Sequence, residues 1–369
     1  MRLLFFDMQL PYLLKGGSPT GGAAVRQYAI VKGLKELDQE VGVLTFKGAK
    51  DFVGESDIEL LECYDQKAGM KNLRVFYLQI PAIYRAIKAY KPDYILTKAV
   101  ALTTGMTAFA GKLLNIPFIY LATSNKDADE RFDEVFNSSV KWSSRFALNY
   151  AKMIICQNHY QYENFQKRYP HKKLSLMHNP FYYQGELPEI LPQSERGYIA
   201  WVANFSDVKN VPAALTIVKK LPEVQFKFAG SVKWGKATLE AYEELKQCPN
   251  VELLGHIDRK NIIGFLSKAY AIMNTSHLEG FSNTFLEAFA AGTPVVTREE
   301  IDPDDLIATN NLGKIIKNYD EFPEAICSLI NDPGFDDMAI RCRNYLMNNH
   351  DHKVQTQKII DSLNELSIN

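Results

Sequence analysis

Hydrophobic residues in the first half of the chain form short continuous runs, separated by longer stretches with helical spacing. The runs that we predict as strands are residues 3–6, 41–46, 94–97, 117–122 and 153–157. Helices are predicted between them, including residues 23–37, 80–90 and 101–114. Strands that are apolar along their whole length are typical of a sheet covered on both faces. The alternation therefore predicts a parallel sheet with helices on both sides.

The same alternation restarts after residues 185–197, where prolines, glycines and acids cluster. Strands are predicted at residues 198–203, 225–229, 251–254, 271–275, 294–297 and 314–316, and helices at 211–220, 237–247 and 259–268. We thus predict an α/β chain with two Rossmann-like, doubly wound domains, 1–185 and 198–345, joined by a linker at 186–197. The helical stretch from about 337 to 366 is long for one domain, so residues 346–369 can cross back onto the first. Open parallel sheets bind ligands at the carboxyl ends of their strands, which places the expected site in a cleft between two facing domains.

Composition narrows the class of protein. The chain has 369 residues, of which 46% are apolar and 23% charged, enough for two globular cores. No apolar run reaches the ~20 residues that span a bilayer, and the first residues lack the apolar region of a signal peptide. Five cysteines without a Cys-x-x-Cys pair argue against a disulfide framework or a zinc site. We expect a cytoplasmic protein with reduced thiols.

The near-zero net charge hides an asymmetry between the halves. Residues 1–185 hold 24 Lys+Arg and 17 Asp+Glu, and the remainder holds 18 and 26. The basic half suits an acidic acceptor or an anionic membrane, but ordinary variation in surface charge explains it equally well. Residues 70–78 and 140–150 mix cations with aromatic residues, a pattern shared by interfacial segments and buried amphipathic helices. A peripheral contact with the inner face of the membrane therefore stays open, and no nucleic-acid partner is expected.

The most informative segment is residues 277–296. It reads as the end of a strand, a glycine turn, the start of a helix and a return to strand. Such a turn is an anion site, because unpaired N–H groups and the positive end of the helix dipole face it. Glu279 precedes the turn and Glu287 lies about one helical turn inside. Two carboxylates around an anion pocket suit a nucleotide sugar, which carries phosphate in the middle and hydroxyls at both ends.

Several motifs occur in a fixed order around this segment. Residues 203–210 read Ala-Asn-Phe-Ser-Asp-Val-Lys-Asn, 228–230 Phe-Ala-Gly, 254–257 Leu-Gly-His-Ile, 279–288 Glu-Gly-Phe-Ser-Asn-Thr-Phe-Leu-Glu-Ala and 292–296 Gly-Thr-Pro-Val-Val. With these motifs, and with Gly21-Gly22-Ala-Ala near the N-terminus, the chain resembles the retaining glycosyltransferases of family 4. These enzymes have the GT-B architecture of two facing Rossmann-like domains. The resemblance is strong over about 200–297.

The resemblance implies roles for individual residues. Glu287 would accept hydrogen bonds from ribose hydroxyls, Glu279 would hold the donor sugar or its reacting face, and Lys209 would stabilise the leaving diphosphate. The other implied donor-binding residues are Gly21, Gly22, Asn204, Gly230, His256, Ile257, Gly280, Phe281, Ser282, Asn283 and Thr284. Ser282 or Asn283 would cap the helix and leave backbone N–H groups for the diphosphate. Each of these residues also has a plain structural interpretation, as a surface carboxylate, a solvated lysine or a loop glycine.

Two positions depart from the family pattern. The family usually has Arg where Asn204 stands, so the diphosphate would have one charge-assisted bond fewer unless Arg26 or Lys126 replaces it. Many members also have a His after the strand near Ala122, where this chain has none, so Ser124, Asn125 and Asp127 become the candidates for the acceptor side. Asp127-Ala-Asp129 matches a metal motif of another glycosyltransferase fold, but we expect a solvated loop there. No metal or cofactor is expected.

The sequence therefore predicts a retaining, metal-independent glycosyltransferase, similar to hexosyltransferases. It would move a sugar from a nucleotide-diphosphate donor to a hydroxyl of a glycan or lipid-linked glycan, in cell-surface polysaccharide or glycoconjugate synthesis. Two alternatives stay open. One is a nucleotide-sugar epimerase of the same architecture, for which the sequence offers no clear acid–base pair. The other is a non-catalytic scaffold that binds a nucleotide sugar.

Overall fold

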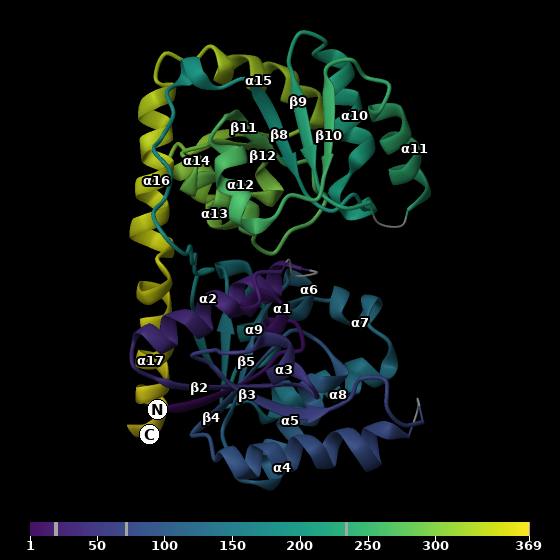
Figure 1. Cartoon of the computed structure of the whole chain (residues 1–369), viewed down its shortest axis with the longest axis vertical. Helices are drawn as coiled ribbons and strands as arrows, with labels where there is room; N and C mark the ends of the chain where they lie inside the picture. The colour runs from purple at the N-terminus through teal and green to yellow at the C-terminus, as the bar shows by residue number, and fades with distance from the viewer. Residues whose placement is uncertain (18–20, 71–72, 233–234, 369) are drawn as a thin grey trace. The chain divides into compact units, whose positions relative to one another are not determined.

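The computed structural model describes residues 1–17, 21–70, 73–232 and 235–368. The chain divides into two compact units (Figure 1). Unit 1 comprises Met1–Tyr182 and Asp351–Asn369, and unit 2 comprises Tyr183–His350. Among the described residues, no helix combines the length and apolar character needed to cross a bilayer.

Unit 1 is built on a parallel sheet of seven strands in the order β3-β2-β1-β4-β5-β6-β7. The strands are β1 Arg2–Phe6, β2 Glu40–Phe46, β3 Glu59–Tyr64, β4 Tyr94–Lys98, β5 Phe118–Leu121, β6 Met153–Cys156 and β7 Lys173–Leu176. The helices are α1 Leu10–Leu14, α2 Gly22–Glu36, α3 Ala49–Val53, the π-helix η1 Val75–Gln79, α4 Ile80–Tyr90, α5 Leu102–Leu113, α6 Asn125–Ala128, α7 Arg131–Val135, α8 Ser138–Tyr150, α9 His159–Arg168 and α17 His352–Ile368. The predicted doubly wound sheet is confirmed.

Both faces of this sheet are buried. Leu3 and Phe5 of β1 join a core with α2 and α17, while Leu4 and Phe6 join a second core with α4, α5 and α8. Successive side chains of a strand point to opposite faces, so one continuous apolar run serves two cores. Figure 1 shows α4, α5 and α8 on one side of the sheet and α2 and α17 on the other.

The C-terminal helix α17 belongs to unit 1 and packs on α2. The Tyr94 hydroxyl donates to the Leu363 carbonyl at 3.1 Å, and Lys173 forms an ion pair with Glu365 at 2.8 Å. The two helices approach most closely at Gly33, where an added Cβ would lie 2.2 Å from the Thr356 hydroxyl and 2.9 Å from the His352 carbonyl oxygen. Only a residue without a side chain fits this contact.

We expect Gly33→Ala to lower the melting temperature, although alanine favours a helix by about 1 kcal/mol over glycine. The collision with α17 adds overpacking of about 1–3 kcal/mol. Gly264→Ala is the matched control, because this glycine is also helical but has open space where its Cβ would stand. Thermal denaturation should show opposite shifts for the two variants; a stabilised Gly33→Ala would contradict the close packing.

Unit 2 has a parallel sheet of six strands in the order β10-β9-β8-β11-β12-β13. The strands are β8 Tyr198–Val202, β9 Phe226–Ala229, β10 Val251–Gly255, β11 Ala269–Met273, β12 Val295–Arg298 and β13 Gly313–Ile316. The α-helices are α10 Val211–Lys220, α11 Lys236–Leu245, α12 Arg259–Leu266, α13 Asn283–Ala290, α14 Leu306–Thr309, α15 Phe322–Ile330 and α16 Phe335–His350. Short 3₁₀ turns are η2 Gln193–Glu195, η3 Asp207–Lys209, η4 Glu299–Ile301, η5 Pro303–Asp305 and η6 Tyr319–Glu321.

The segment predicted as a linker is anchored to unit 2. The guanidinium of Arg196 is buried and donates to the carbonyls of Leu191, Ala269 and Gly292. It also stacks on the Phe335 ring, 5.0 Å from its centroid. These bonds make residues 191–196 part of the folded unit.

Candidate active site

In unit 2, the carboxyl ends of β8 and β11 bring together the residues of the Lys209 and Glu279 motifs. A small cavity there is lined by Lys209, Ser276 and Thr284 together with strand residues. Lys209 ends the 3₁₀ turn η3, Ser276 follows β11, and Thr284 lies in the first turn of α13. Lys209 and Thr284, which are 75 positions apart in sequence, thus line one site.

Backbone and side-chain bonds fix the lysine segment against the loop that follows β11. The Thr275 hydroxyl donates to the Lys209 carbonyl at 2.8 Å and accepts from the indole N–H of buried Trp201 at 3.0 Å. The His277 N–H donates to the Val208 carbonyl at 2.8 Å. Asn210 takes a left-handed conformation and its side chain accepts from the Ala213 N–H, so that α10 begins directly after the lysine.

The two predicted catalytic residues form an ion pair with each other. The Lys209 ammonium contacts Glu279 Oε1, and the same oxygen accepts a hydrogen bond from the Ser276 hydroxyl at 2.9 Å. Their side chains are only 24% and 14% exposed, so solvent screens the pair weakly. The resemblance to family 4 implies separate roles for the two residues, and this ion pair was not predicted.

The start of α13 lacks a side-chain cap. Ser282 occupies the N-cap position, but its hydroxyl bonds to the Thr284 hydroxyl at 2.8 Å instead of to a backbone N–H. The prediction that Ser282 or Asn283 caps the helix is therefore wrong. Phe281 and Gly280 precede the helix, and the Phe281 ring lies 5.3 Å from the His350 ring. The first-turn N–H groups of a helix have no partner within it, so this end suits an anion.

The loops after β8, β9 and β10 contact one another at two glycines, Gly230 and Gly255. Gly230 has φ of 148°, and its N–H donates to the Gly255 carbonyl at 2.7 Å. A Cβ on Gly230 would lie 1.7 Å from the Ala203 carbonyl oxygen, so the backbone of the Asn204 loop runs directly against it. Asn204 is exposed in that loop. His256 is also exposed, with its ring 3.9 Å from the Asp258 carboxylate, and Ile257 is half-buried.

Glu287 lies inside α13 and carries the most perturbed carboxylate of this region. Burial raises its pKa from 4.5 to about 7, and the positive charge of Arg259 opposes that shift. Arg259 begins α12 just after the His256–Ile257 turn. The sequence analysis did not single out Arg259, Ser276 or Thr275, because none of them belongs to the motifs that it used.

Unit 1 has its own cavity of about 320 Å³ at the carboxyl ends of β1 and β4. Its lining includes Gly21, Asp7, Thr97 and Lys98. Gly21 is the N-cap of α2 and Gly22 its first residue, as predicted for the glycine loop. Lys98 forms an ion pair with the buried Asp7 and donates to the Ala23 carbonyl at 3.3 Å. Asp7 and Lys98 were not predicted, because their strands show only an apolar pattern before each charged residue.

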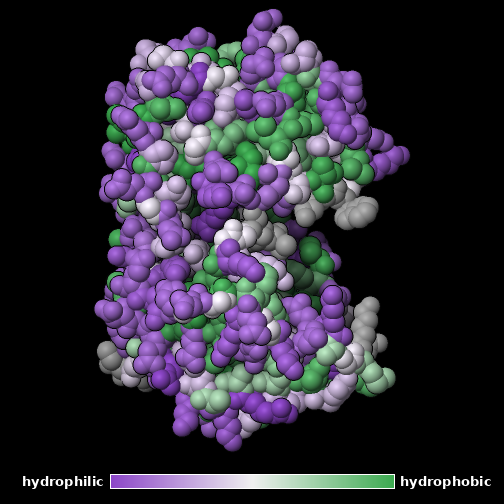
Figure 2. Space-filling view, in the orientation of Figure 1, coloured by the Kyte–Doolittle hydropathy of each residue, from purple (hydrophilic) through white to green (hydrophobic). Residues whose placement is uncertain are grey.

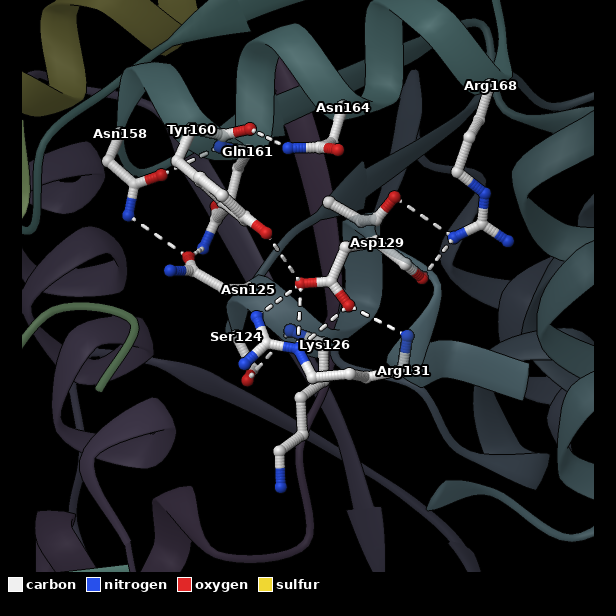
Figure 3. Close-up of polar contacts among 11 residues, drawn as sticks. Ser124, Asn125, Lys126, Asp129, Arg131, Asn158, Tyr160, Gln161, Asn164 and Arg168 are labelled. Carbon is white, nitrogen blue, oxygen red and sulfur yellow. Dashed lines mark hydrogen bonds and ion pairs between the residues drawn. The ribbon is translucent and has the colours of Figure 1, made fainter. Parts of the chain in front are cut away.

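The residues predicted for the acceptor side serve a structural network in the structure. Ser124 and Asp127 form a capping box around α6, and Asp127 also accepts from Thr123 and the Tyr120 hydroxyl. Burial raises the pKa of Asp127, and these hydrogen bonds oppose the shift. Asn125 Oδ1 accepts from Asn158 and Gln161 of the α9 region, each at 3.2 Å (Figure 3).

The prediction of a solvated loop at residues 127–133 is wrong for its first acids. Asp127 and Asp129 are only 2% and 7% exposed. Asp129 pairs with Arg131 and accepts from the Tyr160 hydroxyl at 3.2 Å (Figure 3). Among the residues that the structure describes, no group of three His, Cys, Asp or Glu side chains is arranged to hold a metal ion.

The two candidates for the missing phosphate cation differ in position. Arg26 is 2% exposed and donates to the Ala122 carbonyl inside unit 1, so it is a core residue and not a surface cation. Burial lowers its pKa to about 10. Lys126 is half-buried on α6, and its ammonium extends away from the network of Figure 3.

Comparisons with known proteins agree with this architecture. The family profile "Glycosyltransferase Family 4" matches residues 20–181, and "Glycosyl transferases group 1" matches residues 186–347. The chain belongs to glycosyltransferase family 4. The second profile covers nearly all of unit 2, and the first covers unit 1 apart from residues 1–19 and the C-terminal segment 351–369.

Two curated relatives match parts of this family 4 chain. A poly(glycerol-phosphate) alpha-glucosyltransferase of Bacillus subtilis (strain 168) is 30% identical over 146 residues, which is 38% of this chain and 21% of the relative. The capsular polysaccharide biosynthesis glycosyltransferase CapM of Staphylococcus aureus is 32% identical over 140 residues, 37% of this chain and 36% of the relative. The matches therefore span well under half of either relative.

Solved structures match this glycosyltransferase over its whole length. Sucrose-phosphate synthase (tll1590) from Thermosynechococcus elongatus has a TM-score of 0.76 at 16% identity and covers 100% of this chain and 99% of its own. Anabaena Alr3699/HepE, solved in complex with UDP and glucose, has a TM-score of 0.76 at 17% identity and covers 99% and 100%. At such identities the likeness establishes the GT-B fold alone.

Proposed function

We propose that this family 4 glycosyltransferase is a retaining enzyme that takes its sugar from a nucleotide diphosphate. The observation that carries the proposal is the meeting of Lys209, Ser276 and the uncapped first turn of α13 around one cavity. A cation and a helix N-terminus together stabilise the charge that develops on a departing diphosphate. The UDP in the Anabaena Alr3699/HepE complex is a ligand of this class.

The proposed reaction needs no protein nucleophile. The acceptor hydroxyl forms a bond to the anomeric carbon on the face from which the diphosphate departs. The bond from that carbon to the phosphate oxygen breaks, and the hydroxyl proton passes to the leaving phosphate. In this reaction Lys209 and the α13 N-terminus hold the phosphate. Glu279 orients the sugar hydroxyls once the diphosphate has replaced it as the partner of Lys209. No step requires a metal.

The acceptor class that we propose is a hydroxyl of a glycan or a lipid-linked glycan. The 320 Å³ cavity of unit 1 supports it, because its paired Asp7 and Lys98 offer both an acceptor and a donor of hydrogen bonds. The name of one curated relative concerns a capsular polysaccharide, and that of the other a poly(glycerol-phosphate).

A panel of nucleotide sugars and glycan acceptors tests the function. We expect nucleotide diphosphate to be released only with acceptor, the product to keep the donor's anomeric configuration, and turnover to survive excess EDTA. An inverted product contradicts the retaining mechanism, and complete loss in EDTA contradicts metal independence. Epimerised donor without acceptor identifies an epimerase, and donor binding without any turnover identifies a scaffold.

Glu287 provides a pH-dependent test of the ribose contact. A carboxylate accepts hydrogen bonds more strongly than a carboxylic acid, so nucleotide affinity should rise as the pH increases through about 7. Glu287→Gln should weaken nucleotide binding by roughly 10- to 100-fold at pH 8 and remove the pH dependence. Calorimetric titration of the nucleotide between pH 6 and about 8.5 measures both effects.

At pH 8, Glu287→Gln should weaken nucleotide binding but raise the stability of the ligand-free protein. Because the pKa of Glu287 is higher in the folded protein than in the unfolded chain, its contribution is most favourable below about 4.5 and is lost as pH rises toward 7. Ligand-free Glu287→Gln should therefore melt higher than wild type at pH 8 and nearly equal to it at low pH. A variant that loses both stability and nucleotide binding would indicate a structural role.

A further inference from the structure

Four neighbouring helices of unit 1, namely η1, α4, α5 and α8, contain no acidic residue among their 41 residues. They cover one face of the sheet together with α9, which carries Glu163. At the chain's average of 43 acids in 369 residues, such a stretch would hold about five. It holds none, but has five cations: Arg85, Lys88, Lys112, Lys141 and Arg145. We call the surface of these four helices the acid-free layer.

The acid-free layer also carries every exposed Phe and Trp side chain of the described residues, while exposed Tyr12 and Tyr160 lie elsewhere. Among the described residues, the exposed Phe and Trp side chains are Phe76 at 72%, Phe109 at 40% and Trp142 at 74%, and all three belong to it. Tyr77 of η1 is 53% exposed and Leu113 of α5 is 56% exposed. Met70 and Leu73, which precede η1, are 66% and 53% exposed. Single exposed apolar residues are ordinary, but this grouping on one layer is not.

The aromatic residues and cations of α5 and α8 touch each other. The Phe146 ring stacks on Trp142 at 6.3 Å and lies 6.1 Å from Phe109, and the Lys112 ammonium is 5.6 Å from its centroid. Figure 2 shows green residues interleaved with purple ones along the edge of the molecule formed by α4. Of the five cations, Arg145 is paired with an acid, Asp133 of the neighbouring α7.

We propose that the acid-free layer binds the surface of a bilayer that contains anionic lipids. The cations other than Arg145 attract the lipid headgroups, and exposed Phe, Trp and Leu side chains enter the boundary between headgroups and acyl chains. A second copy of the chain is disfavoured on the same surface, because two acid-free layers face to face would repel. Nucleic acid would satisfy the cations but not the apolar side chains.

This proposal deepens the proposed function in one respect, because it states where a lipid-linked acceptor would be met. It connects the residues 70–78 and 140–150 of the sequence analysis to one surface; Lys71 and Asn72 of the first segment lie outside the described residues. The binding itself involves neither cavity described above. Membrane binding can therefore be measured without donor, acceptor or turnover.

Sedimentation of the full chain with vesicles tests the electrostatic part. We expect partition into vesicles of phosphatidylglycerol mixed with phosphatidylcholine, little into phosphatidylcholine alone, and a marked loss as salt rises from about 0.05 to about 0.5 M. Lys88→Glu/Lys112→Glu should reduce the partition roughly 10- to 30-fold. The control Lys220→Glu/Lys246→Glu changes the net charge equally on exposed helices of unit 2 and should leave the partition nearly unchanged.

A second pair of variants tests the apolar part. Phe76→Ser/Trp142→Ser should weaken binding to anionic vesicles several-fold, while Ile340→Ser/Met347→Ser, at half-exposed apolar positions of α16, should not. Equal binding to neutral and anionic vesicles would overturn the proposal, as would equal losses in the control variants. Retention on nucleic acid, or self-association that the same substitutions abolish, without vesicle binding, would also overturn it. A chain that binds vesicles but transfers no sugar would overturn the proposed function alone.

Discussion

Lys209→Met is expected to reduce turnover by roughly 10²–10³-fold, because it removes a charge-assisted donor from the leaving diphosphate. Methionine keeps the length of the side chain, so the packing around η3 should change little. The steady-state rate with a nucleotide sugar and acceptor measures the effect. The matched control is Lys220→Met, an exposed lysine on the adjoining helix α10, and it should leave turnover unchanged.

Lys209→Met also leaves the Glu279 carboxylate without its cation in a largely buried position. An unpaired buried charge lowers stability, and this effect is separate from the loss of the diphosphate contact. The double variant Lys209→Met/Glu279→Gln distinguishes the loss of stability from the loss of the diphosphate contact. It removes the unpaired charge and keeps a side chain that can accept from Ser276. The double variant should recover stability but stay slow. Near-normal turnover in the double variant would show that the lysine serves only to hold Glu279, and near-normal turnover in Lys209→Met would show that the lysine is not needed for catalysis.

Gly230→Ala is expected to destabilise unit 2 by roughly 2–6 kcal/mol, combining backbone strain with overpacking. Its φ of 148° is rarely accessible to a residue with a side chain, and the new Cβ would collide with a backbone oxygen at 1.7 Å. Such a loss corresponds to a fall in melting temperature of roughly 5–20 °C. The collision can be relieved only by moving the Ala203–Asn204 backbone, so nucleotide binding should weaken as well.

Gly255→Ala is the control for Gly230→Ala. Gly255 also has a positive φ, 66°, but nothing lies within 4 Å of the position of its Cβ. It should cost about 1–2 kcal/mol from the left-handed conformation alone. Calorimetry of both variants compares them directly. If Gly230→Ala is no worse than Gly255→Ala, the close approach of Ala203 does not constrain this turn.

The strands buried on both faces were predicted from sequence, and the edge strands of unit 1 were not. Every residue of β5 and β6 is buried, and such runs are recognisable as buried strands. Strands β3 and β7 lie at the two edges of the sheet, where most side chains are only half-buried. Strand β3, Glu-Leu-Leu-Glu-Cys-Tyr, has neither a continuous nor an alternating apolar pattern, and β7, Lys-Leu-Ser-Leu, alternates over only four residues. The sequence alone therefore did not indicate them.

The candidate site, like the sheets, contains features that could be predicted from the sequence and features that could not. The motifs around Lys209, Gly230 and Glu279 were evident because short-range requirements determine them, namely a glycine turn, a helix start and a strand end. The Lys209–Glu279 ion pair, the burial of Arg26 and Asp127 and the raised pKa of Glu287 were not evident. Each depends on which elements pack against the residue, and spacing along the chain carries no information on that.

The sequence by itself determined that this protein is an α/β chain with two parallel sheets, because apolar periodicity is a local property of the chain, and its glycine-turn motifs carry the resemblance to family 4 glycosyltransferases. Only the tertiary structure decided that Glu279 neutralises Lys209 and that Asp127 caps a helix. It also placed five cations and the exposed side chains of Phe76, Phe109 and Trp142 on one layer of helices. Burial and charge pairing arise from contacts between distant residues, and these exist only after the sheets have formed and the helices have packed on them.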